Sequence, residues 1–153
     1  MEKTTTRESF AESIGKFMHN CGAIEFVVNG AITELATDTT LLDSVLRGPL
    51  NRRIDLLAAL LRERTQLSPN TIDELRRDLH RLREARNKVA HNPIIALNKS
   101  SPDSERIVVF RGAGNRETRE ELTQRDVVLL AASSGMLAER LSNLISECRE
   151  PGS

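Results

Sequence analysis

Aromatic residues are scarce in this sequence of 153 residues, which has four Phe, no Tyr and no Trp. β-Sandwiches draw heavily on aromatic and β-branched side chains, whereas Leu and Ala are plentiful here beside Ile and Val. The balance therefore favours a helical bundle over a β-sandwich. The same scarcity leaves few side chains on which nucleic-acid bases could stack.

An excess of charge of either sign is also absent, since 22 Lys and Arg balance 22 Asp and Glu. A nucleic-acid footprint would therefore have to be local. No apolar run reaches membrane length, and the first residues, 1–5, lack the apolar stretch of a signal peptide. We therefore expect a cytoplasmic protein. Cys21 and Cys148 fall in helical apolar stripes and are expected to be buried thiols.

The familiar cofactor and metal motifs are missing too. The sequence has no Walker loop, GxGxxG, Cys-x-x-Cys or His-Glu-x-x-His, and no elbow motif for Ser-His-Asp chemistry. The three histidines, His19, His80 and His91, are too scattered to suggest a metal site. We expect neither a metal nor a cofactor.

Apolar side chains recur at helical spacing over most of the chain, which predicts one all-α domain spanning residues 1–153 with short flexible termini. We expect a four- to five-helix bundle. The expected helices begin at Thr5 or Thr6, Leu41, Leu50, Pro69 and Thr123. Thr123 and Asp126 have the spacing of a capping box.

A β-hairpin is expected within an insertion at about residues 98–122, before the last helix. Residues 106–111 are rich in β-branched and aromatic side chains, residues 112–115 contain two glycines, and residues 116–122 could return as the partner strand.

One expected helix, residues 69–91, carries an anomaly. Arg86 stands where helical spacing asks for an apolar residue, in a seam otherwise formed by Ile72, Leu75, Leu79, Leu82 and Val89. Burying a guanidinium is costly unless it is paired, and Glu25, beside the seam of the first helix, is a candidate partner. Histidine is the side-chain type that most often serves as acid or base in proteins, and one follows five residues later as His91. Pro93 then stops the helix.

The run Arg86-Asn87-Lys88-Val89-Ala90-His91 has the form Arg, four residues, His, with a polar residue after the Arg. It resembles the signature of HEPN-superfamily proteins, whose ribonuclease members carry this motif near a helix end in a small all-α bundle. The resemblance is sharpest over about residues 82–93 and looser over residues 8–144. It implies a metal-independent endoribonuclease, plausibly a toxin or defence effector that an inhibitory partner protein holds in check.

In ribonucleases of that superfamily, the RNA 2′-hydroxyl attacks the adjacent phosphate. The resemblance implies that His91 acts as general base or acid, that Arg86 binds the phosphate and stabilises its charge, and that Asn87 orients these groups. Glu25 and Lys88 are possible supporting residues. A homodimer that brings two motifs into one cleft is also implied.

Helical geometry adds a constraint to this site. At 100° per residue, Arg86 and His91 lie about 140° apart around an ideal helix, so a straight helix does not direct both to one point. Either the last turn unwinds before Pro93, or a second chain completes the cleft. Residues 76–91 hold six Arg and Lys against two acids, a local charge of +4 that is compatible with RNA binding.

Other interpretations stay open at this point. The charged residues could form a solvated helix face, Arg86 could be a structural clamp, and His91 could cap the helix carbonyls. From Gly48-Pro49-Leu50 to the Arg-Asn-x-x-Ala-His run, the chain also resembles the mannitol operon repressor family, which would imply a non-catalytic regulatory or interaction domain. A small-molecule or nucleotide-binding helper of a catalytic partner is a third alternative.

Overall fold

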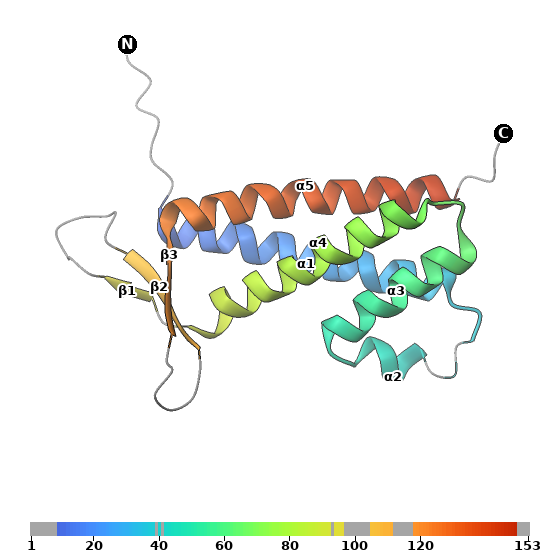
Figure 1. Ribbon diagram of the computed structural model, residues 1–153, viewed down its shortest axis with the longest axis horizontal. Coiled ribbons are helices and arrows are strands. Elements are labelled where there is room, and N and C mark those ends of the chain that lie inside the picture. The colour runs from blue at the N-terminus through green and yellow to red at the C-terminus, as the bar shows by residue number, and fades with distance from the viewer. Residues whose placement is uncertain are drawn as a thin grey trace, which may run out of the picture.

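The computed structural model describes residues 9–38, 40, 42–92, 94–96, 105–111 and 118–149. These residues form five helices and three strands: α1 (Phe10–Leu35), α2 (Leu42–Leu46), α3 (Leu50–Arg64), α4 (Pro69–His91), β1 (Ile94–Ala96), β2 (Glu105–Arg111), β3 (Thr118–Thr123) and α5 (Gln124–Arg149). The predicted mainly helical architecture is confirmed (Figure 1). Among the described helices, none combines the length and the apolar character that crossing a membrane would require.

The two longest helices, α1 and α5, make the most extensive helix–helix contact in the bundle. Figure 1 shows α1 and α5 running in the same direction, and they pack against each other along their length. Helix α4 returns in the opposite direction across them, and α3 packs on both α1 and α4. The C-terminal end of α4 therefore lies at the same end of the molecule as the start of α5.

The apolar seams predicted from the sequence form the core. In α1, six residues of the predicted seam are buried: Phe10, Phe17, Cys21, Ile24, Val28 and Ile32. In α4, all five apolar residues of the seam around Arg86 are buried. Because these side chains recur every three or four residues, each helix buries one continuous face against its neighbours.

Side-chain caps fix the predicted helix starts. Ser68 caps α4, where its Oγ accepts the amide N–H of Thr71 at 3.2 Å, and Pro69 occupies the first turn. The predicted start of α1 at Thr5 or Thr6 lies outside the described residues, in which the helix begins at Phe10. Its cap is Ser9, whose Oγ accepts the Glu12 amide N–H at 3.1 Å.

The hairpin before the last helix is confirmed and extended by a third strand. Strands β2 and β3 are antiparallel, with Val109 opposite Glu120. The sequence did not indicate β1, which pairs antiparallel with β2 and places Ile94 opposite Ile107, so the sheet order is β1-β2-β3. Three residues carry too little periodicity to predict a strand. The sheet lies between the end of α4 and the start of α5 (Figure 1).

Candidate functional site

Arg86 lies near the C-terminal end of α4 and points toward α1. Its Nη2 is 3.8 Å from Oε1 of Glu25, and its Nη1 donates a hydrogen bond of 3.3 Å to Oδ1 of Asn87. The Arg86 side chain is 37% exposed. The residue that interrupts the α4 seam is therefore a half-buried cation that has an acidic neighbour and keeps access to solvent.

A second arginine contacts the same carboxylate. Arg53 of α3 places Nη2 at 3.3 Å from Oε2 of Glu25, and its Nη1 donates a hydrogen bond of 2.8 Å to Oδ1 of Asn29. Glu25 and Asn29 lie one turn apart on α1, so both face the same partner. The Arg53 side chain is only 11% exposed. Three helices thus meet in a cluster of two guanidiniums, one carboxylate and one amide.

Neither Arg53 nor Asn29 was expected from the sequence. A signal for Arg53 was nevertheless present, because it lies three residues after Leu50 and four before Leu57, beside the apolar stripe of α3. Unlike Arg86 in α4, Arg53 does not interrupt the stripe, because the neighbouring Ile54 keeps it apolar. For Asn29 we find no comparable sequence signal.

His91 lies apart from this cluster. Helix α4 stays regular through His91, and the imidazole is exposed. The first of the two geometric alternatives, an unwound last turn, is therefore wrong. Among the described residues, the helix carbonyl of Lys88 is capped by Asn92, whose Nδ2 donates to it at 2.8 Å. That cap makes the imidazole of His91 unnecessary as a helix terminator.

Lys88 is directed toward the sheet. Its Nζ lies 2.7 Å from Oε1 of Glu120 on β3, and its side chain is 23% exposed. The structure thus brings together Arg86, Asn87 and Glu25, whereas Lys88 and His91 point elsewhere on the same helix.

The Cys21 thiol, which lies near the cluster, is expected to be unreactive at neutral pH. Cys21 is buried, and burial raises its pKa to about 12. The nearby Arg86 guanidinium opposes this rise, whereas the Glu25 carboxylate adds to it. Burial also raises the pKa of the half-buried Cys148. Because the thiolate is the nucleophilic form, neither cysteine suits covalent catalysis at neutral pH.

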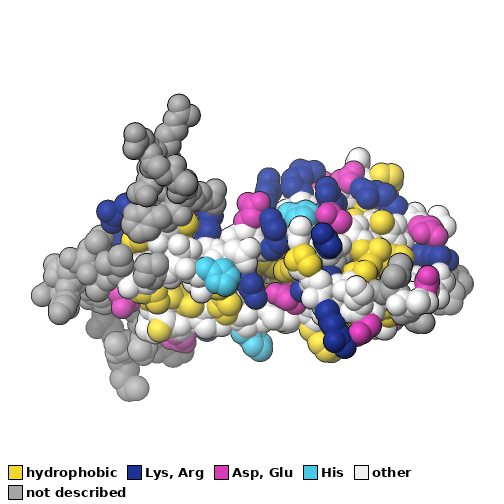
Figure 2. Space-filling view, turned by 90° about the horizontal axis from the view of Figure 1, so that it is seen from below, with side chains coloured by type: hydrophobic (Ala, Val, Ile, Leu, Met, Phe, Trp, Pro, Cys, Tyr) yellow, Lys and Arg dark blue, Asp and Glu magenta, His cyan; other side chains and the backbone are white. Residues whose placement is uncertain are grey.

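The basic character of α4 is largely offset by neighbouring acids. Asp55 of α3 lies 2.7 Å from Nη2 of Arg76 and 3.0 Å from Nε2 of His80. Asp78 lies 3.6 Å from Arg81. Figure 2 accordingly shows Lys and Arg side chains standing among Asp and Glu over the helical part of this face. A phosphate backbone would meet scattered cations here and no continuous basic surface.

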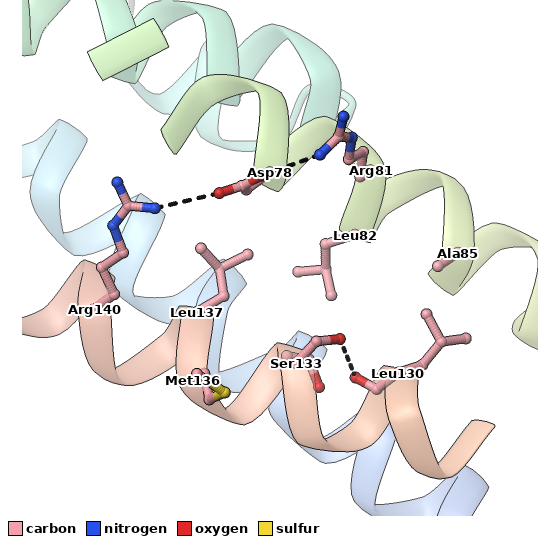
Figure 3. Close-up of a pocket in the computed structure, with 10 residues that line it drawn as sticks. Asp78, Arg81, Leu82, Ala85, Leu130, Ser133, Met136, Leu137 and Arg140 are labelled. Atoms are coloured by element: carbon pink, nitrogen blue, oxygen red, sulfur yellow. Dashed lines mark hydrogen bonds and ion pairs between the residues drawn. The ribbon is translucent and has the colours of Figure 1, made fainter. Parts of the chain in front are cut away.

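A groove of about 570 Å³ between α4 and α5 lies away from the cluster. Figure 3 shows Leu82, Leu130 and Leu137 directed into it, with Asp78 bridging to Arg140 at one end. Its Ser133 hydroxyl donates to the Leu130 carbonyl at 3.1 Å. Because no histidine or free acid lines this groove, it lacks the groups that proton transfer needs.

Within the described part of the chain, no three His, Cys, Asp or Glu side chains are grouped as a metal site. Arg86, Asn87 and Glu25 can supply charge stabilisation and hydrogen bonding. Comparisons of the chain with models of protein families, with curated proteins and with solved structures give no significant match.

Proposed function

We propose that this chain is a metal-independent endoribonuclease of the HEPN type, acting in the cytoplasm as a toxin or defence effector under the control of an inhibitory partner. The observation that carries the proposal is the state of Arg86. It is a half-exposed guanidinium beside Asn87 on a regular helix that ends with an exposed histidine. A structural arginine on a leucine seam would be expected to be buried and fully paired.

The proposed reaction needs no group beyond these side chains and the RNA. The 2′-oxygen bonds to phosphorus, the bond to the 5′-oxygen breaks, and a 2′,3′-cyclic phosphate and a 5′-hydroxyl result. His91 takes the proton of the 2′-hydroxyl as general base and then delivers it to the leaving 5′-oxygen as general acid. Arg86 binds the phosphate oxygens through its two-pronged donor group. Asn87 orients the guanidinium to which it is hydrogen-bonded.

The proposed centre draws on two chains. On a regular helix, Arg86 and His91 point about 140° apart, and Arg86 is directed to Glu25 of α1. We therefore place the Arg86 and the His91 of one centre on different chains. A homodimer would place His91 of one copy beside Arg86 of the other.

The direct test is cleavage of a mixed-sequence RNA in EDTA by wild type, Arg86→Ala and His91→Ala. We expect loss of roughly 10²–10³-fold for Arg86→Ala and 10²–10⁴-fold for His91→Ala. His19→Ala removes an exposed histidine from α1 and should cleave like wild type. Equal cleavage by all of these proteins, or cleavage by none, would refute the proposal.

A second candidate function is a non-catalytic regulatory or interaction domain, as the likeness to the mannitol operon repressor family implies. The observation that favours it is the ion pair of Arg86 with Glu25, together with the acids interleaved along α4. On that account Arg86→Ala would lower the melting temperature markedly, His91→Ala would not, and no variant would have an activity to lose.

A further inference from the structure

The Glu25 carboxylate lies between two arginines, with Oε2 toward Arg53 and Oε1 toward Arg86, and the two contacts differ in length. Its contact with Arg53 measures 3.3 Å and that with Arg86 measures 3.8 Å. The Arg53 guanidinium is also fixed by Asn29 at 2.8 Å. The carboxylate is therefore anchored on α3, and Arg86 is its looser partner.

Burial separates the two arginines further. Arg53 is 11% exposed, and its buried Nε has no hydrogen-bond partner among the described residues. Removing Glu25 from it would leave a desolvated cation with only the amide of Asn29 as partner. Arg86, at 37% exposed, can exchange Glu25 for another anion at its solvent-facing side. Two guanidiniums and one carboxylate also leave one positive charge in the cluster, which matches the single charge of a phosphodiester.

We propose that Arg53 is a positioning residue that holds Glu25 back from Arg86 and so keeps Arg86 available to a phosphodiester. Without Arg53, the carboxylate and Arg86 would neutralise each other, and a phosphate would have to displace Glu25. Asn29 supports the arrangement by fixing the Arg53 guanidinium. The inference rests on the proposed function, in which Arg86 is the phosphate-binding group.

The test measures binding of a fluorescent 2′-O-methyl oligonucleotide, which lacks the free 2′-hydroxyl and cannot be cleaved. We expect Arg53→Met to weaken binding and Glu25→Gln to strengthen it, each by roughly tenfold, the size of one charged contact. Both effects should vanish in an Arg86→Ala background. A merely structural role would move both variants in the same direction.

Asp55→Asn is the matched control, since it removes an acid of α3 that contacts Arg76 and His80 of α4 and neither Arg53 nor Arg86 in the described contacts. It changes the net charge as Glu25→Gln does and should change affinity far less. Arg53→Lys keeps the charge but loses the two-pronged geometry, and it should bind more weakly than wild type even if Arg53→Met does not fold.

Three results would overturn the inference: no binding by wild type, changes of the same sign in Arg53→Met and Glu25→Gln, or opposite changes that persist without Arg86. The experiments distinguish a failure of this inference from a failure of the proposed function. RNA cleavage that depends on Arg86, without opposite binding effects, would refute the role of Arg53 alone. Opposite binding effects without any RNA cleavage would refute the ribonuclease alone.

Discussion

At the scale of single residues, Arg86 interrupts an apolar stripe and Arg53 lies beside one, and the two side chains differ in exposure. Arg53→Met should lower the free energy of unfolding by about 1.5–3 kcal/mol, because it removes the charged donor of Asn29 and the nearer of the two charged partners of Glu25. Arg86→Ala should cost less than about 1 kcal/mol, since solvent screens its longer contact. Urea denaturation of the two variants measures both. An equally large loss for Arg86→Ala would favour a structural arginine and the non-catalytic alternative.

The cysteines provide a second test at this scale. Because burial raises the pKa of Cys21 to about 12, almost no Cys21 thiolate forms at pH 8, and burial also raises the pKa of Cys148. Native protein should therefore react slowly with a thiol-specific disulfide reagent, and both thiols should react at once in guanidinium chloride. Rapid reaction of Cys21 in the native protein would contradict the packing of α1 described here.

Sequence periodicity located Arg86, and Glu25 was a candidate for its neighbour, because each lies on or beside a regular apolar stripe. The cluster as a whole could not be predicted from the sequence. Arg53 and Asn29 belong to α3 and α1, and only the packing of these helices shows that one carboxylate serves two arginines. Local sequence reports which face of a helix is buried, but not which residues of separate helices meet there.

At the scale of the helices, α5 depends on a capping box at its start. The backbone N–H and the hydroxyl of Thr123 both donate to Asp126 at 2.7 Å, and the Thr123 Oγ accepts the Asp126 amide N–H at 3.2 Å. The hydrogen bond from the Thr123 hydroxyl is the main reason that the pKa of Asp126 lies below its usual value, and the hydrogen bond from the Thr123 backbone N–H lowers it further. The predicted start of this helix is therefore confirmed in its atomic detail.

Thr123→Ala should lower the free energy of unfolding by about 1 kcal/mol at pH 7. Because the Asp126 pKa is lower in the folded protein, its contribution is complete above the unfolded pKa of about 4 and is lost as the pH falls through the folded value. The difference between variant and wild type should therefore shrink below pH 4. Ser146→Ala, which removes an exposed hydroxyl from the same helix, should change little. A difference that stays constant down to pH 2 would contradict the role of Asp126.

Helix ends with a specific cap and long apolar seams were predictable, as α4 illustrates from Ser68 to His91. Strand β1 was not, since Ile94–Ala96 is defined by its pairing with β2 and not by its own pattern. Tertiary contact, which the local sequence does not contain, decides such cases.

At the scale of the whole molecule, the regularity of α4 decides between the two arrangements expected of the site. Arg86 is directed to Glu25 of α1, while His91 is exposed on a straight last turn. With the unwound alternative excluded, the proposed chemistry requires Arg86 and His91 from different copies of the chain.

The most direct measurement of this claim uses a heterodimer of Arg86→Ala and His91→Ala chains, coexpressed with different tags and isolated by both. Each variant alone should form a dimer, twice the chain mass of 17.1 kDa, and should be inactive on RNA in EDTA. One of the two centres of the heterodimer keeps both Arg86 and His91, so we predict roughly half of the wild-type activity. A monomeric wild type, or a heterodimer no more active than either variant alone, would contradict a centre shared between two chains.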